Sequence, residues 1–206
     1  MKTISKKTIE RVLLYLRTLE GLIKEKRYLV SSKQLAQIIG LTDAQIRKDI
    51  SSFGKVVGTP GIGYKTKELK KTLEKFVLQQ NVVHIVLFGV GNLGTAIMKY
   101  PGFQGKKIKI VAAFDKTKSK IGKKMHGVSI YPVIRAPEII AKTHADIGVI
   151  AVPKEYSQEV ADVMVLSGLR GIVNFSPISI SVPQNVKVKD IDLSIEFLSL
   201  FCNTHI

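Results

Sequence analysis

Three glycines and one aspartate in this sequence have the types and the spacing of a dinucleotide-binding site. Gly89, Gly91 and Gly94 directly follow the apolar run 82–88. Asp115 stands 21 residues after Gly94, at the end of a second apolar run. In such an array the first glycine permits a sharp turn, the second lets the backbone approach a pyrophosphate, and the third lets the next helix pack closely. Because a carboxylate at the second strand end accepts hydrogen bonds from ribose hydroxyls and repels a 2′-phosphate, the pattern predicts NADH or NAD+ rather than NADP.

The predicted cofactor site includes the residues around these four. The carboxyl ends of later strands should line the same crevice. The full set of expected cofactor-binding residues is Gly89, Val90, Gly91, Asn92, Leu93, Gly94, Asp115, Val152, Pro153 and Asn174. Pro153 can alternatively do no more than end its strand. Lys116 and Lys118 stand beside Asp115, so their charge weakens the expected discrimination against a 2′-phosphate.

A second group of polar side chains lies on a stretch typical of a DNA-recognition helix. Thr42 and Gln45 have the spacing of a capping box, which predicts that a helix begins there. This helix is expected to bury Ala44, Ile46, Ile50 and Phe53, and to expose Gln45, Arg47, Lys48 and Ser51 or Ser52. Arginine and lysine bind phosphate or guanine, and glutamine pairs with adenine. The alternative is a plain helical bundle with a solvated polar face.

Two earlier helices must position this recognition helix. Apolar residues at steps of three and four predict a helix over 8–26; they are Ile9, Val12, Leu13, Leu16, Leu19, Leu22 and Ile23. Ser31 and Ser32 predict the start of a second helix, and Gly40 predicts its end at a position that favours left-handed backbone. Two short helices around a glycine-containing turn form a helix-turn-helix pattern.

Residues 56–65 have short β-branched pieces around glycine and proline, which predict a hairpin like the wing of a winged helix. Gly61 and Gly63 at its tip have no side chain to obstruct a sugar-phosphate backbone, so both are expected DNA contacts. A plain surface turn explains them equally well. A fourth helix is expected over 68–78, with Leu69, Leu73, Phe76 and Val77 on one face.

The rest of the chain alternates strand and helix, which predicts a parallel sheet covered by helices. Strands are expected at 82–88, 108–114, 146–153, 171–175 and 186–191. A helix over 155–167 should pack on the sheet through Val160, Ala161, Val163, Met164 and Leu166. Asp192 offers a cap for a final helix, whose apolar character favours packing on a second subunit. The expected fold class is α/β, with a winged helix-turn-helix domain over 1–80 and a Rossmann-type domain over 81–206.

The charge of the chain favours an anionic partner. Its net charge is +16, with 17 Lys and Arg against 7 Asp and Glu in residues 1–80, and 15 against 9 in the rest. An excess of this kind favours nucleic acid, although a lysine-rich proteome produces part of it without any function. No apolar run reaches the roughly 18 residues of a membrane span, and the N-terminus has no signal-peptide pattern, so a cytoplasmic location is expected.

The residues that catalysis or metal binding would require are missing from the sequence. None of the six tyrosines has a lysine four residues later, the four histidines are scattered, and Cys202 has no metal-ligand spacing around it. We therefore expect neither a catalytic residue nor a metal site. A nucleotide held without a substrate indicates sensing. The alternative is a small NAD- or CoA-binding enzyme with a basic helical appendage.

Ordered motifs along nearly the whole chain resemble the Rex family of redox-sensing transcriptional repressors. They are YLR at 15–17, VSS at 30–32, LA at 35–36, QIRKD at 45–49, FG at 53–54, GIGY at 61–64, GVGNLG at 89–94, YPGF at 100–103, AAFD at 112–115, AVP at 151–153, QEVAD at 158–162, NFSP at 174–177 and DL at 192–193. The resemblance implies a homodimer that binds an inverted-repeat operator and exchanges C-terminal helices between subunits. Binding of NADH would rotate the DNA-binding domains out of register.

The same resemblance implies roles for three further residues. Tyr100 and Asp192 would take part in the switch across the dimer, and Leu193 would approach the nicotinamide from the partner subunit. The sequence also departs from the family, because Ser52 replaces an aromatic residue and Pro60 lies where the family has an arginine. The lysines at 116 and 118 replace less basic residues. A second alternative is therefore a family paralogue that binds DNA but responds weakly to NADH.

Overall fold

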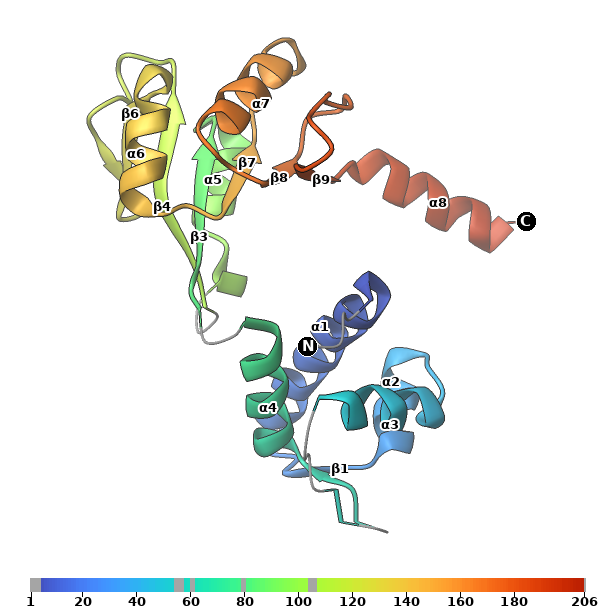
Figure 1. Cartoon of the computed structure of the whole chain (residues 1–206). Helices are drawn as coiled ribbons and strands as arrows, with labels where there is room; N and C mark the ends of the chain where they lie inside the picture. Colours follow the sequence, from blue (N-terminus) through green and yellow to red (C-terminus); the bar gives the residue numbers. More distant parts are fainter. Residues whose placement is uncertain (1–4, 54–57, 60–61, 79–80, 104–106, 206) are drawn as a thin grey trace. The chain divides into compact units, whose positions relative to one another are not determined.

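The computed structural model describes residues 5–53, 58–59, 62–78, 81–103 and 107–205. The chain divides into two compact units, Met1–Asn81 and Val82–Ile206 (Figure 1), where the sequence predicts a division after residue 80. Each unit has its own hydrophobic core. Within the described residues, no helix is long and apolar enough to cross a membrane.

The first unit contains four helices and a two-stranded sheet. Its elements are α1 (Lys6–Lys24), β1 (Leu29–Val30), α2 (Ser32–Ile39), α3 (Asp43–Ser52), β2 (Tyr64–Lys65) and α4 (Thr66–Leu78). All four helices contribute to one core, whose fully buried members include Val12, Tyr15, Leu19, Leu35, Ile46, Leu69 and Leu73. The predicted helix-turn-helix followed by a fourth helix is therefore confirmed.

Side-chain caps begin α2 and α3 where the sequence predicts them. The Ser31 hydroxyl accepts from the Gln34 backbone N–H at 3.1 Å, and the Gln34 side-chain Oε1 accepts from the Ser31 backbone N–H at 2.9 Å. Gly40 ends α2 with a φ of 76°, which is the left-handed conformation that glycine favours. The Thr42 hydroxyl caps α3 by accepting from the Gln45 N–H, but the Gln45 side chain turns elsewhere. The capping box predicted at Thr42 is therefore only half formed.

Three residues predicted to be buried in this unit are exposed. Ile9 and Leu13 of α1 are 39% and 49% exposed, and Tyr15 is buried instead. Ala44 of α3 is also exposed, whereas Asp49 is buried. Apolar residues on α1 cover a broader arc than the core uses, so packing against the other helices selects which part of that arc is buried.

Only part of the hairpin predicted over 56–65 lies within the described residues. β2 pairs antiparallel with β1, which precedes α2, and the turn is closed by an antiparallel bridge between Thr59 and Gly63. Gly63 has a φ of 101°, and a Cβ there would collide with the backbone at the end of β1, so the fold itself requires this glycine. Residues 54–57 and 60–61, which include the predicted DNA contact Gly61, lie outside the described part of the chain.

The second unit is a seven-stranded sheet with helices on both faces. Its elements are β3 (Val83–Phe88), α5 (Asn92–Met98), η1 (Pro101–Phe103), β4 (Ile108–Asp115), β5 (Lys124–Met125), β6 (Val128–Pro132), η2 (Val133–Arg135), α6 (Ala136–Thr143), β7 (Ile147–Ile150), η3 (Lys154–Tyr156), α7 (Ser157–Leu166), β8 (Gly171–Asn174), β9 (Lys187–Asp190) and α8 (Leu193–His205). The strand order is β5-β6-β4-β3-β7-β8-β9, and only the β5–β6 pair is antiparallel among these pairs. From β6 to β9 this is the order of a doubly wound dinucleotide-binding sheet, whose switch point lies between β3 and β7.

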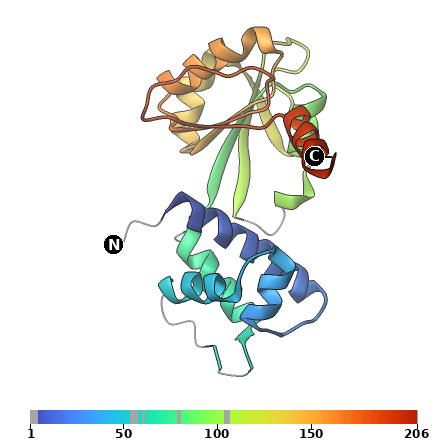
Figure 2. The same ribbon diagram turned by 90° about the vertical axis from the view of Figure 1, so that its right-hand side faces the viewer.

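Alternate residues of β3 face opposite sides of this sheet. Val86 and Phe88 pack in the core with α6 and α7, whereas Ile85 and Leu87 pack in the core with α5. Figure 2 shows α5 on the face of the sheet opposite α6 and α7. The Phe88 ring stacks on Phe114 of β4, with the ring centroids 4.5 Å apart. The unbroken apolar sequence of β3 thus reflects a strand buried on both faces.

The second unit differs from the sequence-based expectations in two places. Residues 116–145 contain β5, β6 and α6, for which the sequence predicts no element. Leu166, predicted to pack on the sheet, is 85% exposed because it is the last residue of α7 and faces solvent. The predicted final helix is confirmed as α8. Every described residue of α8 is exposed, and Figure 1 shows it projecting from the end of β9.

Candidate functional site

The exposed face of α3 carries three of the predicted DNA contacts. Arg47 forms an ion pair with Asp43 one turn earlier, and the two side chains are 57% and 43% exposed. Lys48 is exposed and forms no ion pair with any residue that the structure describes. The Ser51 hydroxyl donates to the Lys48 carbonyl at 2.9 Å. Lys48 is therefore free to bind another molecule. An exposed ion pair contributes at most about 1 kcal/mol, so Asp43 holds the Arg47 side chain only weakly.

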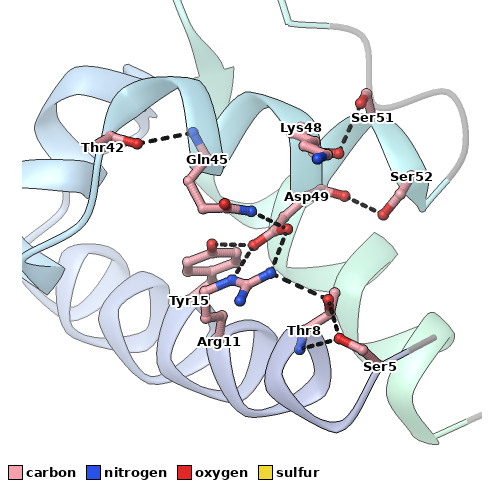
Figure 3. Close-up of polar contacts among 10 residues, drawn as sticks. All are labelled: Ser5, Thr8, Arg11, Tyr15, Thr42, Gln45, Lys48, Asp49, Ser51 and Ser52. Carbon is pink, nitrogen blue, oxygen red and sulfur yellow. Dashed lines mark hydrogen bonds and ion pairs between the residues drawn. The ribbon is translucent and has the colours of Figure 1, made fainter.

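Behind this face, the carboxylate of Asp49 points from α3 toward α1 (Figure 3). Asp49 is only 4% exposed, and four hydrogen bonds surround it. Arg11 donates twice, from Nε at 2.6 Å and from Nη2 at 2.8 Å. The Tyr15 hydroxyl donates at 2.6 Å, and the Gln45 amide donates from Nε2 at 2.8 Å. This network ties the recognition helix to α1 through charge-assisted hydrogen bonds.

The network keeps each of its groups in one protonation state. Burial by itself raises the pKa of Asp49, but the hydrogen bonds from Arg11, Tyr15 and Gln45 outweigh burial, so the pKa of Asp49 lies below its ordinary value. The hydrogen bond to Asp49 raises the pKa of Arg11. Burial, with the adjacent carboxylate, raises the pKa of Tyr15. Asp49 is therefore an acceptor, and Arg11 and Tyr15 are donors, at any pH near neutrality.

The structure gives Gln45 a different position from the expected one. The sequence predicts an exposed side chain that pairs with adenine, but Gln45 is half-buried and its amide is bonded to Asp49. Sequence reasoning also misses Arg11 and Tyr15. The spacing of these residues contained a signal. Arg11 and Tyr15 lie four residues apart, so both side chains are on the same face of α1, and Gln45 and Asp49 have the same spacing on α3.

In the second unit, the turn between β3 and α5 contains the three predicted glycines. Gly89 has a φ of 95°, and a Cβ there would collide with the carbonyl of Ala151. A Cβ on Gly94 would collide with the carbonyl oxygen of Gly89. Both glycines are therefore required by the packing of the chain on itself.

Gly91 is different from the other two glycines. Its φ is −83°, which other residues adopt readily, and a Cβ there would have no neighbour within 4 Å among the described residues. Nor does any described side chain cap the start of α5 at this position. The space in front of Gly91 is therefore open to a molecule that approaches the backbone closely, as the pyrophosphate of a dinucleotide does.

Asp115 lies at the end of β4, beside this turn. Its carboxylate accepts from the Val90 N–H at 2.8 Å, from the Thr117 N–H at 2.8 Å and from Lys120 Nζ at 3.3 Å. Lys120 also donates to the Val90 carbonyl at 2.8 Å. Burial raises the pKa of Asp115, but these hydrogen bonds outweigh it and lower the pKa below its ordinary value. Asp115 is thus an ionised acceptor that joins β4 to the glycine-rich turn.

The other predicted cofactor residues lie in two kinds of environment. Asn92 and Leu93 at the start of α5 are exposed, as is Pro153 after β7, whereas Val152 is half-buried. Asn174 has no exposed surface. Its amide donates to the Ile178 carbonyl and to Asp190, both at 2.8 Å, and accepts from the Ser176 N–H at 3.0 Å. The Asn174 side chain therefore ties β8 to β9.

Of the three residues predicted for the switch, Tyr100 and Leu193 are exposed and Asp192 is half-buried. Tyr100 is 57% exposed and contacts the Phe103 ring edge-on, with centroids 5.2 Å apart. Asp192 accepts from the hydroxyl of Ser194 at 2.6 Å and from its N–H at 2.9 Å, and these bonds lower the pKa of Asp192. Leu193 is 64% exposed. These side chains are available to a partner molecule.

Comparisons with known proteins match both units. Residues 81–178 match the family "CoA binding domain", and residues 3–51 match "Putative DNA-binding protein N-terminus". A "Redox-sensing transcriptional repressor Rex" from Pelotomaculum thermopropionicum is 42% identical and covers 95% of this chain and 92% of its own. One from Carboxydothermus hydrogenoformans is 40% identical, with 97% and 96% covered. The crystal structure of RSP with β-NAD+ and operator DNA has a TM-score of 0.86 at 32% identity, covering 99% of this chain and 94% of RSP.

The first unit is a helix-turn-helix unit, and the second is a Rossmann unit with an open glycine-rich turn. Together they define the class of DNA-binding regulators that carry a nucleotide site. A further crystal structure describes RSP as a Rex-family repressor and aligns with this chain at a TM-score of 0.84 and 31% identity. The chain belongs to the Rex family of redox-sensing transcriptional repressors.

The Asp49 network predicts a specific loss of stability. Replacing Asp49 by Asn leaves the donors of half-buried Arg11 and buried Tyr15 without their charged acceptor. We expect the first unit to lose about 1–3 kcal/mol of unfolding free energy, measured by urea denaturation of the full chain. The control is Asp43→Asn, which removes an exposed ion pair and should cost less than about 1 kcal/mol. Equal losses in the two variants would contradict the assigned role.

The same network predicts how stability depends on pH. The pKa of Asp49 is lower in the folded chain than in the unfolded chain, so its contribution is present above about pH 4 and is lost as the pH falls through the folded pKa. Acidification below about pH 4 should therefore destabilise the wild type more than Asp49→Asn.

Replacement of each glycine of the turn by alanine should affect the stability of the fold differently. Gly91→Ala should unfold at the wild-type temperature, because its Cβ meets no described atom. Gly89→Ala and Gly94→Ala should each lose about 1–3 kcal/mol, because their Cβ atoms collide with backbone. Differential scanning calorimetry would measure all three, and a destabilised Gly91→Ala would show that the fold also needs this glycine.

Proposed function

We propose that this chain is a cytoplasmic repressor that binds operator DNA as a homodimer and is released when NADH binds. The operator would be an inverted repeat that the first unit of each subunit contacts. The nucleotide would bind at the turn 89–94 of the second unit. The chain would catalyse no reaction on the nucleotide, which would act as a signal of the NADH/NAD+ ratio.

The observation that carries the nucleotide site is the open space at Gly91. The other two glycines of the turn are explained by contacts within the chain, and this one is not. A dinucleotide supplies the missing reason, because its pyrophosphate must approach the backbone there. Asp115 supports NADH over NADPH, because it is an ionised carboxylate at the strand end that would face the adenosine ribose.

The DNA site is supported by the exposed charge of α3. Lys48 and Arg47 would bind phosphate or guanine, and Arg47 can exchange its exposed partner Asp43 for a phosphate at little cost. Ser51 and the turn around Gly63 would contact the DNA backbone. Gln45 would hold the recognition helix in place through Asp49.

The homodimer is supported by α8. Six large apolar side chains on this helix are 58–72% exposed; they are Leu193, Ile195, Phe197, Leu198, Leu200 and Phe201. A surface of this kind is unusual on a monomer and is explained by a second copy of the chain. Tyr100, Asp192 and Leu193 would then lie where one subunit can respond to the nucleotide of the other.

The relatives support the regulated release. Curated relatives that cover nearly the whole chain are named redox-sensing repressors. RSP has been crystallised with β-NAD+ and operator DNA, and separately with β-NADH. Both RSP structures align with more than nine-tenths of each chain, at TM-scores of 0.86 and 0.85.

The direct test is release of DNA by nucleotide. A duplex enriched from a random library by the full chain would be labelled, and its fluorescence anisotropy followed while NADH or NAD+ is added. We expect NADH to release the duplex at much lower concentration than NAD+. The operator should weaken NADH binding by the same factor as NADH weakens operator binding. Binding that ignores both nucleotides would contradict the sensing role.

Lys48→Ala tests the DNA contact. We expect weaker binding to the operator and, if the contact is to phosphate, a slope of log affinity against log salt that is smaller by about one. The affinity for NADH should not change. The control is Lys71→Ala, which removes an exposed lysine from α4, outside the helix-turn-helix. Equal effects of the two substitutions would argue that only overall charge matters.

Gly91→Ala tests the nucleotide site without disturbing the fold. The added methyl group would occupy the space that the pyrophosphate needs, so we expect at least a tenfold loss of NADH affinity, roughly the effect of 1.4 kcal/mol. The variant should still bind the operator, and NADH should no longer release it. Unchanged NADH affinity, measured by isothermal titration calorimetry, would rule out this position for the pyrophosphate.

A further inference from the structure

A cation–π contact joins two loops at the carboxyl edge of the sheet. Lys116 Nζ lies 3.6 Å from the centroid of the Tyr156 ring. Lys116 directly follows Asp115 at the end of β4, and Tyr156 ends η3, after β7. In the sheet, β3 lies between β4 and β7, and Phe88 is in register with both Phe114 and Ile150. The contact therefore connects the loops on either side of the strand that leads into the glycine-rich turn.

These two loops are where the adenosine half of a dinucleotide would lie in a sheet of this order. Lysines near Asp115 would decide whether an extra 2′-phosphate is attracted there. Lys120 is bound to the Val90 carbonyl and to Asp115, so part of its charge is already matched. Lys116 is exposed and differs from Lys120, because its contact is with an aromatic ring and not with a carboxylate.

We propose that Tyr156 is a specificity-determining residue that holds the ammonium group of Lys116 over its ring and withholds it from an adenosine 2′-phosphate. Asp115 repels the 2′-phosphate directly, and Tyr156 prevents the adjacent lysine from cancelling that repulsion. The inference rests on the proposed function, since it assumes that NADH binds at this crevice. It explains how a lysine next to Asp115 is compatible with a preference for NADH.

The size of the effect follows from the contact. A cation–π interaction between partly exposed groups shifts an equilibrium by about two- to fivefold. Tyr156 is 39% exposed, which places this pair at such a partly exposed site. Freeing Lys116 should therefore raise the affinity for NADPH relative to NADH by about two- to fivefold.

The experiment measures both nucleotides on the full chain. NADH binding would be followed by its fluorescence, and NADPH binding by isothermal titration calorimetry, with competition against NADH up to millimolar concentration. Tyr156→Ala should raise the NADPH to NADH affinity ratio about two- to fivefold, whereas Tyr156→Phe, which keeps the ring, should stay near the wild type. In Tyr156→Ala combined with Lys116→Met the gain should disappear. Combination with Lys118→Met is the matched control and should keep the gain.

Each other result contradicts the inference. An unchanged ratio in Tyr156→Ala, including the case in which NADPH binds neither protein, shows that Tyr156 does not limit NADPH binding. Equal losses of NADH and NADPH show that the ring contacts the adenosine itself. A gain that persists without Lys116 shows that another cation is responsible. Failure of the wild type to bind NADH contradicts the proposed function itself, so the two failures are distinguishable.

Discussion

The carboxylate of Asp49 is buried within the first unit, so its charge must be matched by donors from the residues around it. Arg11 and Tyr15 from α1 and Gln45 from α3 supply those donors. The exposed side chains that would contact DNA lie on the same short helix, one turn or less from this carboxylate. The orientation of the recognition helix against α1 therefore depends on satisfying one buried charge.

The second unit also contains a buried carboxylate that must be matched by donors, at the end of β4 beside the glycine-rich turn. Asp115 is 8% exposed, and backbone N–H groups of Val90 and Thr117 together with Lys120 satisfy its carboxylate. Because one of those N–H groups belongs to the glycine-rich turn, the charge that would select the ribose also holds the turn in shape. Selection of the ligand and stability of the site thus depend on the same hydrogen bonds.

Much of the fold could be predicted because its signals are local. The apolar run of β3, the caps at Ser31 and Thr42, and the left-handed glycine at Gly40 each depend on residues within one turn or one strand. Elements in 116–145 were harder to predict. β5 has only two residues, and α6, unlike the equally short α2, has neither a side-chain cap at its start nor a glycine at its end. Leu166 shows the same limit, because a helix end can turn its last apolar residue to solvent.

The sequence by itself determined the class of each site, because glycine spacing, the position of Asp115 and the basic face of α3 are properties of residue type and order. Only the tertiary structure decided which of these residues are free to bind. It joined Gln45 to Asp49, buried the amide of Asn174 between two strands, and placed Lys116 on the ring of Tyr156. The physical reason is that these partners, except Gln45 and Asp49, are distant in sequence, and a hydrogen-bonding or charged group takes whichever partner packing brings within reach.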